Sequence, residues 1–435
     1  MNSRTKRTAG TGGEERALTP KLRFPEFQDT EAWPVIKLNK LLFEAKHRNR
    51  ALELGPEDVL SVSGEHGCVN QIEFMGRSYA GATVKDYHVV EHGDIVYTKS
   101  PLKKNPYGII KENKGRLGIV STLYAVYRPY PGCSATFLDH FFSVDYNLNS
   151  YLQPIVRKGA KNDMKVNNAD VLKGGICIPC LPEQQKIADC LDSVDALIEA
   201  QGRKVVVLKS HKKGLMQQLF PQEGETQPRL RLPKYQGSEE WISKSLGEIF
   251  DTASGGTPDR RDEKLWNGNI PWVTTSLVDF NTINEFEEFI SETGLNKSSA
   301  KMFPRDTVII AMYGQGKTRG KVALLGAIAA TNQACAAILP KKGVNPKFVF
   351  QCLSSRYEEL RRQSNSGGQE NLSQGLIQAL LFSYPKDEFE QQDIADCFTS
   401  IDDLIAAEIR KLETFKVHKK GLMQQLFSSV VEDYA

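Results

Sequence analysis

Apolar residues recur every three or four positions in two long segments, 183–220 and 390–427. This spacing places them on one face and predicts two amphipathic helices. Pro182 suits the first turn of the first helix, and Asp387 with Glu390 suits the start of the second. At 1.5 Å per residue, about 36 residues give a rod of roughly 54 Å whose apolar face needs a partner. The apolar positions are Ile187, Cys190, Val194, Leu197, Ile198 and Leu208, then Ile394, Cys397, Ile401, Leu404, Ile405, Leu412 and Phe415.

The two helical segments are copies of one another. They align without a gap at an offset of 207 and end in the same ten residues, His211–Phe220 and His418–Phe427. A second pair of matching segments, Lys21–Trp33 and Arg229–Trp241, aligns at an offset of 208. The chain is therefore a tandem duplication.

The sequences between these markers, roughly 34–180 and 242–386, share no comparable identity. β-branched and aromatic runs predict strands at 92–98 and 306–313, and helices are expected near 137–157 and 346–362. Each insert is thus expected to mix α and β structure. A shared frame that holds two different inserts is expected if the inserts perform two different recognitions.

The expected fold class is α+β, with two mixed α/β domains separated by two long antiparallel helices. The helices form a coiled-coil spacer, and the halves are related by a pseudo-two-fold tandem duplication. The predicted order is a disordered tail 1–19, a first domain 20–182, a first helix 183–220, a linker 221–227, a second domain 228–386, a second helix 387–427 and a C-terminal tail 428–435.

Length, charge and apolar content narrow the functional classes. The 435 residues suit two or three domains, and the net charge of +3 means that any nucleic-acid surface must come from local clusters. The longest apolar stretch, Val322–Ala330, is too short to span a bilayer, and the N-terminus has no apolar signal segment. We expect a cytoplasmic protein without a membrane partner, whose eight cysteines are reduced.

Two loops carry polar and basic side chains directly after a predicted strand, one in each insert. Residues 98–108 combine lysines with Asn105 and Tyr107, and residues 313–319 form a Gly-rich turn. Such loops suit contacts with phosphates and base edges, although a solvated turn has the same composition. Residues 157–163 and 362–371 form a second pair of polar loops. A nucleotide-phosphate loop at 314–318 is the alternative, but its first glycine would fall at 311, which is Ala.

Two metal-like patterns are interpreted as structural. His88–His92 fits the H-x-x-E-H spacing, but its valines and the following Gly93-Asp94 favour extended chain rather than the helix that such a zinc site needs. Cys177–Cys180 is a lone CxxC without a second pair. We expect no metal site. Because no catalytic motif is present either, we expect no enzyme active site in this chain.

These residues resemble the specificity subunit, HsdS, of Type I restriction-modification enzymes. The resemblance rests on Leu181–Ile198 and its echo Glu390–Ile405, on the two identical ten-residue ends, and on motifs in the second insert. Those motifs are Gly255–Pro258, Trp266, Ile270–Trp272, Met312–Lys321 and Thr331–Ala334. Cys180 departs from the usual Pro-rich sequence before the first helix, without putting any function in doubt.

The resemblance implies two target-recognition domains that each read one half of a split sequence in double-stranded DNA. Two modification (methyltransferase) subunits would dock on the helices, and restriction (translocase/endonuclease) subunits would complete the complex. S-adenosylmethionine, ATP and Mg would belong to those partners, with no cofactor in this chain. A nucleotide-binding enzyme and a coiled-coil protein adaptor remain the alternatives. DNA contacts are expected from Lys99, Ser100, Lys103, Lys104, Asn105, Tyr107, Lys161 and Asn162, and from Tyr313, Gln315, Lys317, Thr318, Arg319, Gln369 and Asn371.

Overall fold

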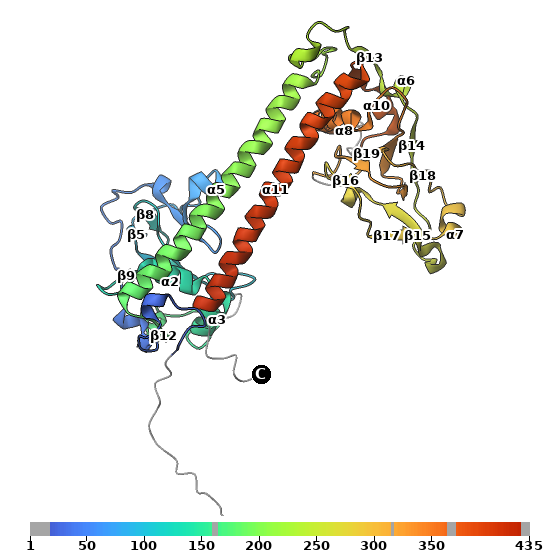
Figure 1. Cartoon of the computed structure of the whole chain (residues 1–435). Coiled ribbons are helices and arrows are strands. Elements are labelled where there is room, and N and C mark those ends of the chain that lie inside the picture. The colour runs from blue at the N-terminus through green and yellow to red at the C-terminus, as the bar shows by residue number, and fades with distance from the viewer. Residues whose placement is uncertain (1–17, 159–163, 315–316, 363–370, 428–435) are drawn as a thin grey trace, which may run out of the picture. The chain divides into compact units, whose positions relative to one another are not determined.

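The computed structural model describes residues 18–158, 164–314, 317–362 and 371–427 (Figure 1). The chain forms two compact units. The first contains residues 1–201 and 411–435, and the second contains residues 202–410. Each unit therefore combines one insert with one part of each long helix.

The two long helices are α5 (Leu181–Leu219) and α11 (Glu388–Leu426), each of 39 residues. Within the first unit, the start of α5 runs antiparallel to the end of α11, and Lys419 Nζ lies 2.5 Å from Asp195 Oδ2. Within the second unit, Lys212 Nζ lies 2.6 Å from Asp402 Oδ1. These two ion pairs occupy equivalent positions of the duplication. The predicted helices and their antiparallel pairing are confirmed.

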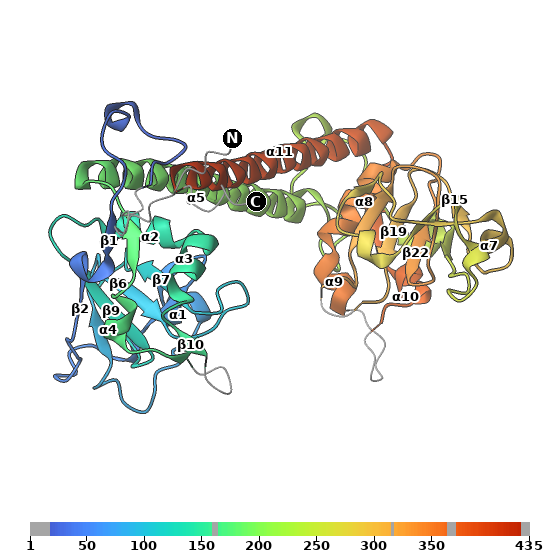
Figure 2. The ribbon, with the colours of Figure 1, turned by 90° about the horizontal axis from the view of Figure 1, so that it is seen from below.

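The first unit is built on a four-stranded antiparallel sheet in the order β2-β9-β6-β7. The helices α2 and α3 lie beside this sheet (Figure 2). The remaining strands form the pairs β1-β12, β3-β4, β5-β8 and β10-β11. The bounds are β1 Val35–Lys37, β2 Leu42–Glu44, β3 Leu60–Ser63, β4 Gly67–Asn70, α1 Gln71–Met75, β5 His88–Val90, β6 Ile95–Thr98, β7 Ile109–Glu112, β8 Gly118–Val120, β9 Tyr124–Pro129, α2 Ala135–Phe142, α3 Asp145–Leu152, β10 Arg157–Lys158, β11 Met164–Lys165, α4 Asn168–Val171 and β12 Gly175–Cys177.

The second unit contains a five-stranded sheet, β14-β22-β19-β20-β16, and a four-stranded sheet, β17-β15-β21-β18. The pair β13-β23 stands apart from both sheets. The bounds are β13 Ile242–Ser245, α6 Leu246–Ile249, β14 Thr252–Ser254, β15 Trp266–Val273, β16 Thr282–Ile283, β17 Glu288–Ile290, α7 Glu292–Asn296, β18 Met302–Phe303, β19 Val308–Ala311, β20 Val322–Leu325, β21 Ala329–Thr331, β22 Cys335–Ile338, α8 Pro346–Ser355, α9 Tyr357–Arg362, α10 Gln374–Ala379 and β23 Leu381–Tyr384.

The two inserts contain sheets of the same topology, although their sequences show no comparable identity. The order β2-β9-β6-β7 in the first unit matches β14-β22-β19-β20 in the second, and in both the inner strand pairs antiparallel with its two neighbours. Two helices follow in each unit, α2 and α3 or α8 and α9. The duplication therefore includes the inserts, whose sequences have diverged while the topology has been kept.

Repeated residues at the helix starts hold each insert to its frame. Glu183 accepts two hydrogen bonds from the Arg23 guanidinium, both at 2.7 Å, and Glu390 accepts two from Arg231 at 2.7 and 2.6 Å. Both carboxylates are almost completely buried. A bidentate arginine–carboxylate pair has one favoured geometry, so it fixes the segment before each insert against its helix.

The next repeated residue is a glutamine, Gln184 or Gln391, which binds the backbone at two further points of the insert. The Gln184 amide donates to the Pro179 carbonyl at 2.8 Å and accepts from the Ser134 backbone N–H at 2.9 Å. Gln391 makes the equivalent bonds to Pro385 at 2.8 Å and from Asn345 at 2.7 Å. Since Ser134 and Asn345 cap α2 and α8, the repeated glutamine ties those helices to the long ones.

The apolar faces of the long helices complete the cores. Ile187 and Leu191 of α5 and Leu426 of α11 belong to the core of the first unit. Leu219 of α5 and Ile394 of α11 occupy corresponding positions in the core of the second. Each long helix therefore packs apolar side chains into the cores of both units, whereas the predicted apolar positions Leu197 and Leu404 are exposed.

Two elements differ from the sequence prediction. The helix expected near 137–157 is broken between α2 and α3, where Val144 adopts an extended conformation as the N-cap of α3. The helix expected near 346–362 is broken at Arg356, whose guanidinium binds Glu359 and the Leu381 carbonyl. Neither break falls at Gly or Pro, so local sequence gives no stop signal there. Across the described residues, no helix is both long and apolar enough to cross a membrane.

Candidate nucleic-acid interface

The first candidate loop connects β6 to β7, and the second connects β19 to β20. Because these strands are equivalent in the two sheets, the two loops occupy equivalent positions. Gly108 and Gly320 precede the returning strands with φ of +95° and +84°. At Gly108 a Cβ atom would lie 2.1 Å from the Thr98 carbonyl oxygen, so only glycine fits the close approach there.

The first loop presents Ser100, Lys103 and Lys104 as exposed side chains, whereas Lys99 and Tyr107 are half-buried. Burial lowers the pKa of Lys99. Asn105 is buried, and its amide donates to Asp145 Oδ1 at 2.9 Å. Asn105 therefore shapes the loop, while the two neighbouring lysines are the groups available to a ligand.

The second loop exposes Tyr313 and Lys317, and Thr318 is half-buried. Arg319 is buried, and its guanidinium donates to the Arg361 carbonyl at 3.2 Å. Asn371, in the second polar loop of this insert, is half-buried. The predicted contacts Lys161, Asn162, Gln315 and Gln369 lie outside the described residues.

Polar side chains outside the predicted set hold both loops. In the first unit, the Asn149 amide donates to the Lys104 carbonyl and the Tyr97 hydroxyl donates to the Tyr107 carbonyl. In the second unit, the Tyr357 hydroxyl donates to the Lys317 carbonyl. Asn149 lies on α3 and Tyr357 on α9. No sequence pattern singles these residues out, because each contact is made with a distant part of the chain.

Three sequence motifs of the second insert meet at one place. The Gly256 N–H donates to the Thr331 carbonyl at 2.9 Å, and the Thr257 hydroxyl donates to the Gln333 side chain. The Trp272 indole N–H donates to the Gly256 carbonyl at 3.0 Å. The Arg260 guanidinium lies 4.0 Å from the centroid of the Trp266 ring and pairs with Glu288. The motifs therefore brace β15 against β21.

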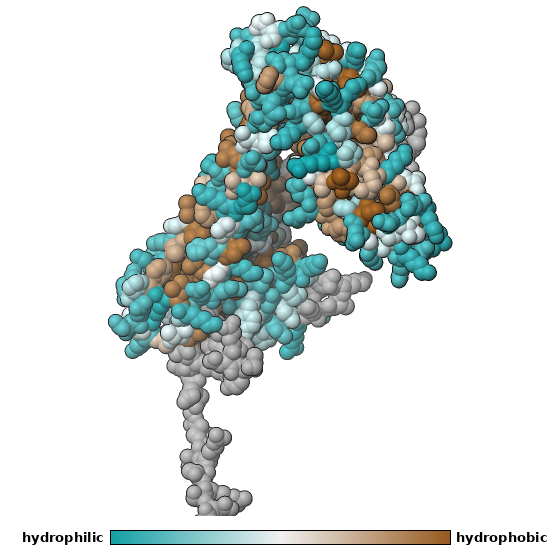
Figure 3. Space-filling view, turned by 45° about the vertical axis from the view of Figure 1, so that its right-hand side comes forward, coloured by the Kyte–Doolittle hydropathy of each residue, from teal (hydrophilic) through white to brown (hydrophobic). Residues whose placement is uncertain are grey.

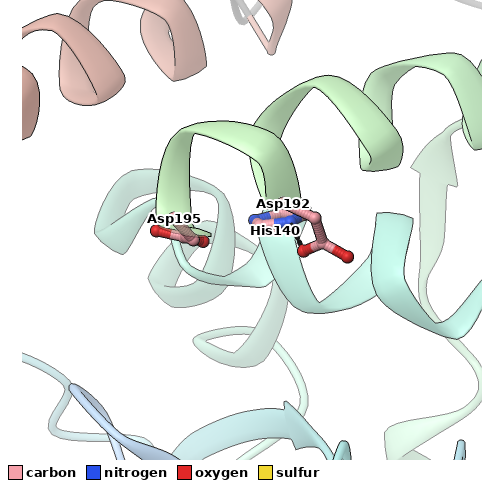
Figure 4. Close-up of side chains that lie close together, drawn as sticks. All are labelled: His140, Asp192 and Asp195. Carbon is pink, nitrogen blue, oxygen red and sulfur yellow. Dashed lines mark hydrogen bonds and ion pairs between the residues drawn. The ribbon is translucent and has the colours of Figure 1, made fainter. Parts of the chain in front are cut away.

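His140, Asp192 and Asp195 form the group best placed to hold a cation among the described residues (Figure 4). His140 Nε2 lies 2.9 Å from Asp192 Oδ1, and this hydrogen bond is the main cause that lowers the pKa of Asp192 to about 2. Lys114 Nζ lies 2.7 Å from the same oxygen, and Lys419 binds Asp195. Because lysines neutralise both carboxylates, and the Asp195–Lys419 pair recurs in the second unit, the group is a structural ion-pair network.

The H-x-x-E-H pattern is not helical, as predicted: it begins on strand β5 and ends in a turn. His88 begins β5 and is buried, whereas His92 follows the strand and is exposed. Cys177 ends β12, and Cys180 immediately precedes α5. Neither cysteine is part of a disulfide.

Comparisons with known proteins identify a matching domain family and structures of similar fold. Residues 238–414 match the model of the Type I restriction modification DNA specificity domain. They run from just before β13 into α11 and include the second candidate loop. The structure is similar to the S subunit of a Type I restriction-modification system from M. genitalium, with a TM-score of 0.56 and 14% identity over 95% of this chain and 100% of that chain. It is also similar to a chain of an assembled type I R-M system, with a TM-score of 0.55 and 16% identity over 91% of this chain and 97% of that chain.

Proteins of similar sequence are also specificity subunits of Type I restriction enzymes. The specificity subunit of the Type I restriction enzyme MjaIX from Methanocaldococcus jannaschii is 28% identical over 172 residues, which cover 38% of this chain and 39% of that protein. The EcoR124I/EcoR124II specificity subunit from Escherichia coli is 28% identical over 174 residues, which cover 39% and 42%. The chain spans about two fifths of the length of these two relatives. The predicted resemblance to Type I restriction-modification specificity subunits is confirmed, as is the predicted fold class.

Proposed function

We propose that this chain is the non-catalytic DNA-reading subunit of a Type I restriction-modification complex, with each insert reading one half of a bipartite site. The observation that carries the proposal is the equivalence of the two loops. Two sequences without comparable identity build the same sheet topology. The loop between β6 and β7 exposes Lys103 and Lys104, and the loop between the equivalent strands β19 and β20 exposes Lys317. Two domains that recognise different DNA half-sites need the same scaffold with different loop side chains, and this is the arrangement of the two inserts.

The proposal includes docking of two modification subunits on the long helices. Apolar side chains lie on the exposed surface of these helices (Figure 3). Leu197 of α5 is 54% exposed, and Leu404 of α11 is 44% exposed. The two leucines are 207 positions apart and therefore equivalent in the duplication. Two copies of one partner can thus make the same contact, one in each unit. In this proposal S-adenosylmethionine, ATP and Mg bind to the modification and restriction partners.

Substitution of the loop lysines tests the assignment of one insert to one half-site. Lys317→Ala should weaken recognition of one half, and Lys103→Ala with Lys104→Ala should weaken the other. Each contact that reads a base edge is worth about 1–3 kcal/mol. The readout is methylation sequencing of a randomised duplex library by the complex with its modification subunits, analysed separately for each half.

Lys37→Ala and Lys244→Ala are the matched controls, because these exposed lysines lie on the equivalent frame strands β1 and β13. Equal weakening of both halves by each loop variant would contradict the assignment. An unchanged site for all loop variants would contradict a DNA-reading role for the loops.

A further inference from the structure

Each of the two loops accepts a side-chain hydrogen bond at its backbone, and the donor lies on an equivalent helix in each unit. Asn149 Nδ2 donates to the Lys104 carbonyl at 3.2 Å, and the Tyr357 hydroxyl donates to the Lys317 carbonyl at 2.6 Å. In both units the donor lies on the second of the two helices that follow the sheet, α3 or α9. In both units the acceptor is the backbone of an exposed lysine in the loop. The inserts share no comparable sequence identity, so this contact between helix and loop has been kept with the topology and not with the sequence.

Tyr357 is itself held from several sides. Its hydroxyl accepts a hydrogen bond from Arg361 Nη1 at 2.8 Å. Its ring packs edge-on against Phe280, with centroids 5.2 Å apart. The Arg361 carbonyl in turn accepts from the Arg319 guanidinium at 3.2 Å. Helix α9 therefore grips the segment Lys317–Arg319 at two points and leaves the Lys317 side chain exposed.

Helix α3 does the same in the first unit. Besides the Asn149 contact, its first residue, Asp145, accepts a hydrogen bond from the buried Asn105 amide at 2.9 Å. Both contacts act on adjacent loop residues, and the side chains of Lys103 and Lys104 stay exposed. A loop held at its backbone presents its side chains in fewer orientations, which lowers the entropic cost of placing them against a ligand.

We propose that Tyr357 and Asn149 are positioning residues that set how sharply each insert discriminates its half-site, without touching DNA themselves. The proposal rests on the proposed function. Loss of one such hydrogen bond is worth a factor of about 2–10 in an equilibrium. The effect is confined to the half-site read by the loop that the residue holds.

Tyr357→Phe removes the hydroxyl and keeps the ring on Phe280. Tyr235→Phe is the matched control, because the Tyr235 hydroxyl also donates a hydrogen bond in the second unit, to Asp393 Oδ2 at 2.7 Å on the long helix α11. Both full-length variants are assembled with the modification subunits and sequenced for methylation on a randomised duplex library. Tyr357→Phe is expected to reduce discrimination about 2–10-fold at the half weakened by Lys317→Ala. The other half stays at the wild-type value, and Tyr235→Phe changes neither half.

Asn149→Ala repeats the test in the first unit. Asn167→Ala is its control, because the exposed Asn167 amide donates to Asp170 Oδ2 at 3.1 Å rather than to the loop. Asn149→Ala is expected to affect the half weakened by the Lys103 and Lys104 substitutions. Equal profiles for Tyr357→Phe and Tyr235→Phe, or equal losses at both halves, overturn the positioning role. A wild-type complex without half-site preferences overturns the proposed function itself, and the wild-type library alone shows which of the two has failed.

Discussion

At the scale of single residues, His88 shows how the fold controls a charge. It is 2% exposed on β5, and Nδ1 has no partner among the described residues. Burial, assisted by the charge of Arg48, lowers the pKa of His88 to about 4. The unfolded chain takes up this proton near pH 6.5, and the folded chain only near pH 4. Acid therefore favours unfolding: the stability present above pH 6.5 is lost progressively down to about pH 4.

Replacing His88 by Gln should flatten this pH dependence. Between pH 7 and pH 5, the free energy of unfolding of the wild-type chain should fall by about 2 kcal/mol more than that of His88→Gln. Denaturant unfolding at the two pH values measures the difference. His92→Gln is the control, because His92 is exposed and lies only four residues away. A wild-type pH dependence in His88→Gln would show that burial does not govern this titration.

In the candidate site, the positions of the loops could be predicted from sequence, but the burial of individual loop residues could not. The positions of both loops follow from strand patterns and turn residues, which are local signals, and the structure places the loops at equivalent points. The burial of Asn105 and Arg319 could not be predicted, because it depends on Asp145 and on Arg361, which lie 40 and 42 residues away in sequence. A polar side chain in a loop has the same local pattern whether it faces solvent or supports the loop.

At the scale of elements, the long helices were predictable to within a few residues, whereas the helices of the inserts were not. The duplication explains the difference, because the two copies start and end at matching residues and so indicate the bounds of both helices. The break between α2 and α3 has no such signal. It follows from packing around Ser143, whose hydroxyl accepts from Lys111 Nζ at 2.6 Å and donates to the Asp139 carbonyl at 2.6 Å. Tertiary contacts of this kind override the helical pattern.

The equivalent leucines give a prediction about these helices. Leu197→Asp and Leu404→Asp should each remove one copy of the modification subunit from the complex, and the double variant should remove both. A charge at the centre of an apolar contact cannot be desolvated cheaply, while an exposed position tolerates it in the free chain. Native mass spectrometry reports the stoichiometry. Leu123→Asp is the control, because Leu123 is 66% exposed and lies in the first insert. Full stoichiometry in the double variant would exclude this surface.

At the scale of the whole molecule, the division into units falls inside both long helices, after Gln201 in α5 and after Arg410 in α11. The core of the first unit uses the start of α5 and the end of α11, and the core of the second uses the opposite ends. Extra helical residues placed at the two division points therefore disturb neither core. In the proposed function, the inserted residues lengthen the helix pair that sets the distance between the two half-sites.

Matched insertions of four helix-forming residues after Gln201 and after Arg410 should therefore change the spacer alone. Each insertion adds about 6 Å of helix, against about 3.4 Å per base pair of DNA. Since some of this length is taken up by re-registering the helix pair, the preferred spacer should grow by one or two base pairs, with the letters of both halves unchanged. Methylation sequencing of a randomised library measures both quantities. The control is the same insertion after Gly224, in the segment that follows α5, which should leave the spacer as it is. An active double-insertion variant that keeps the original spacer, or that reads different letters, would show that the helices do not set the distance.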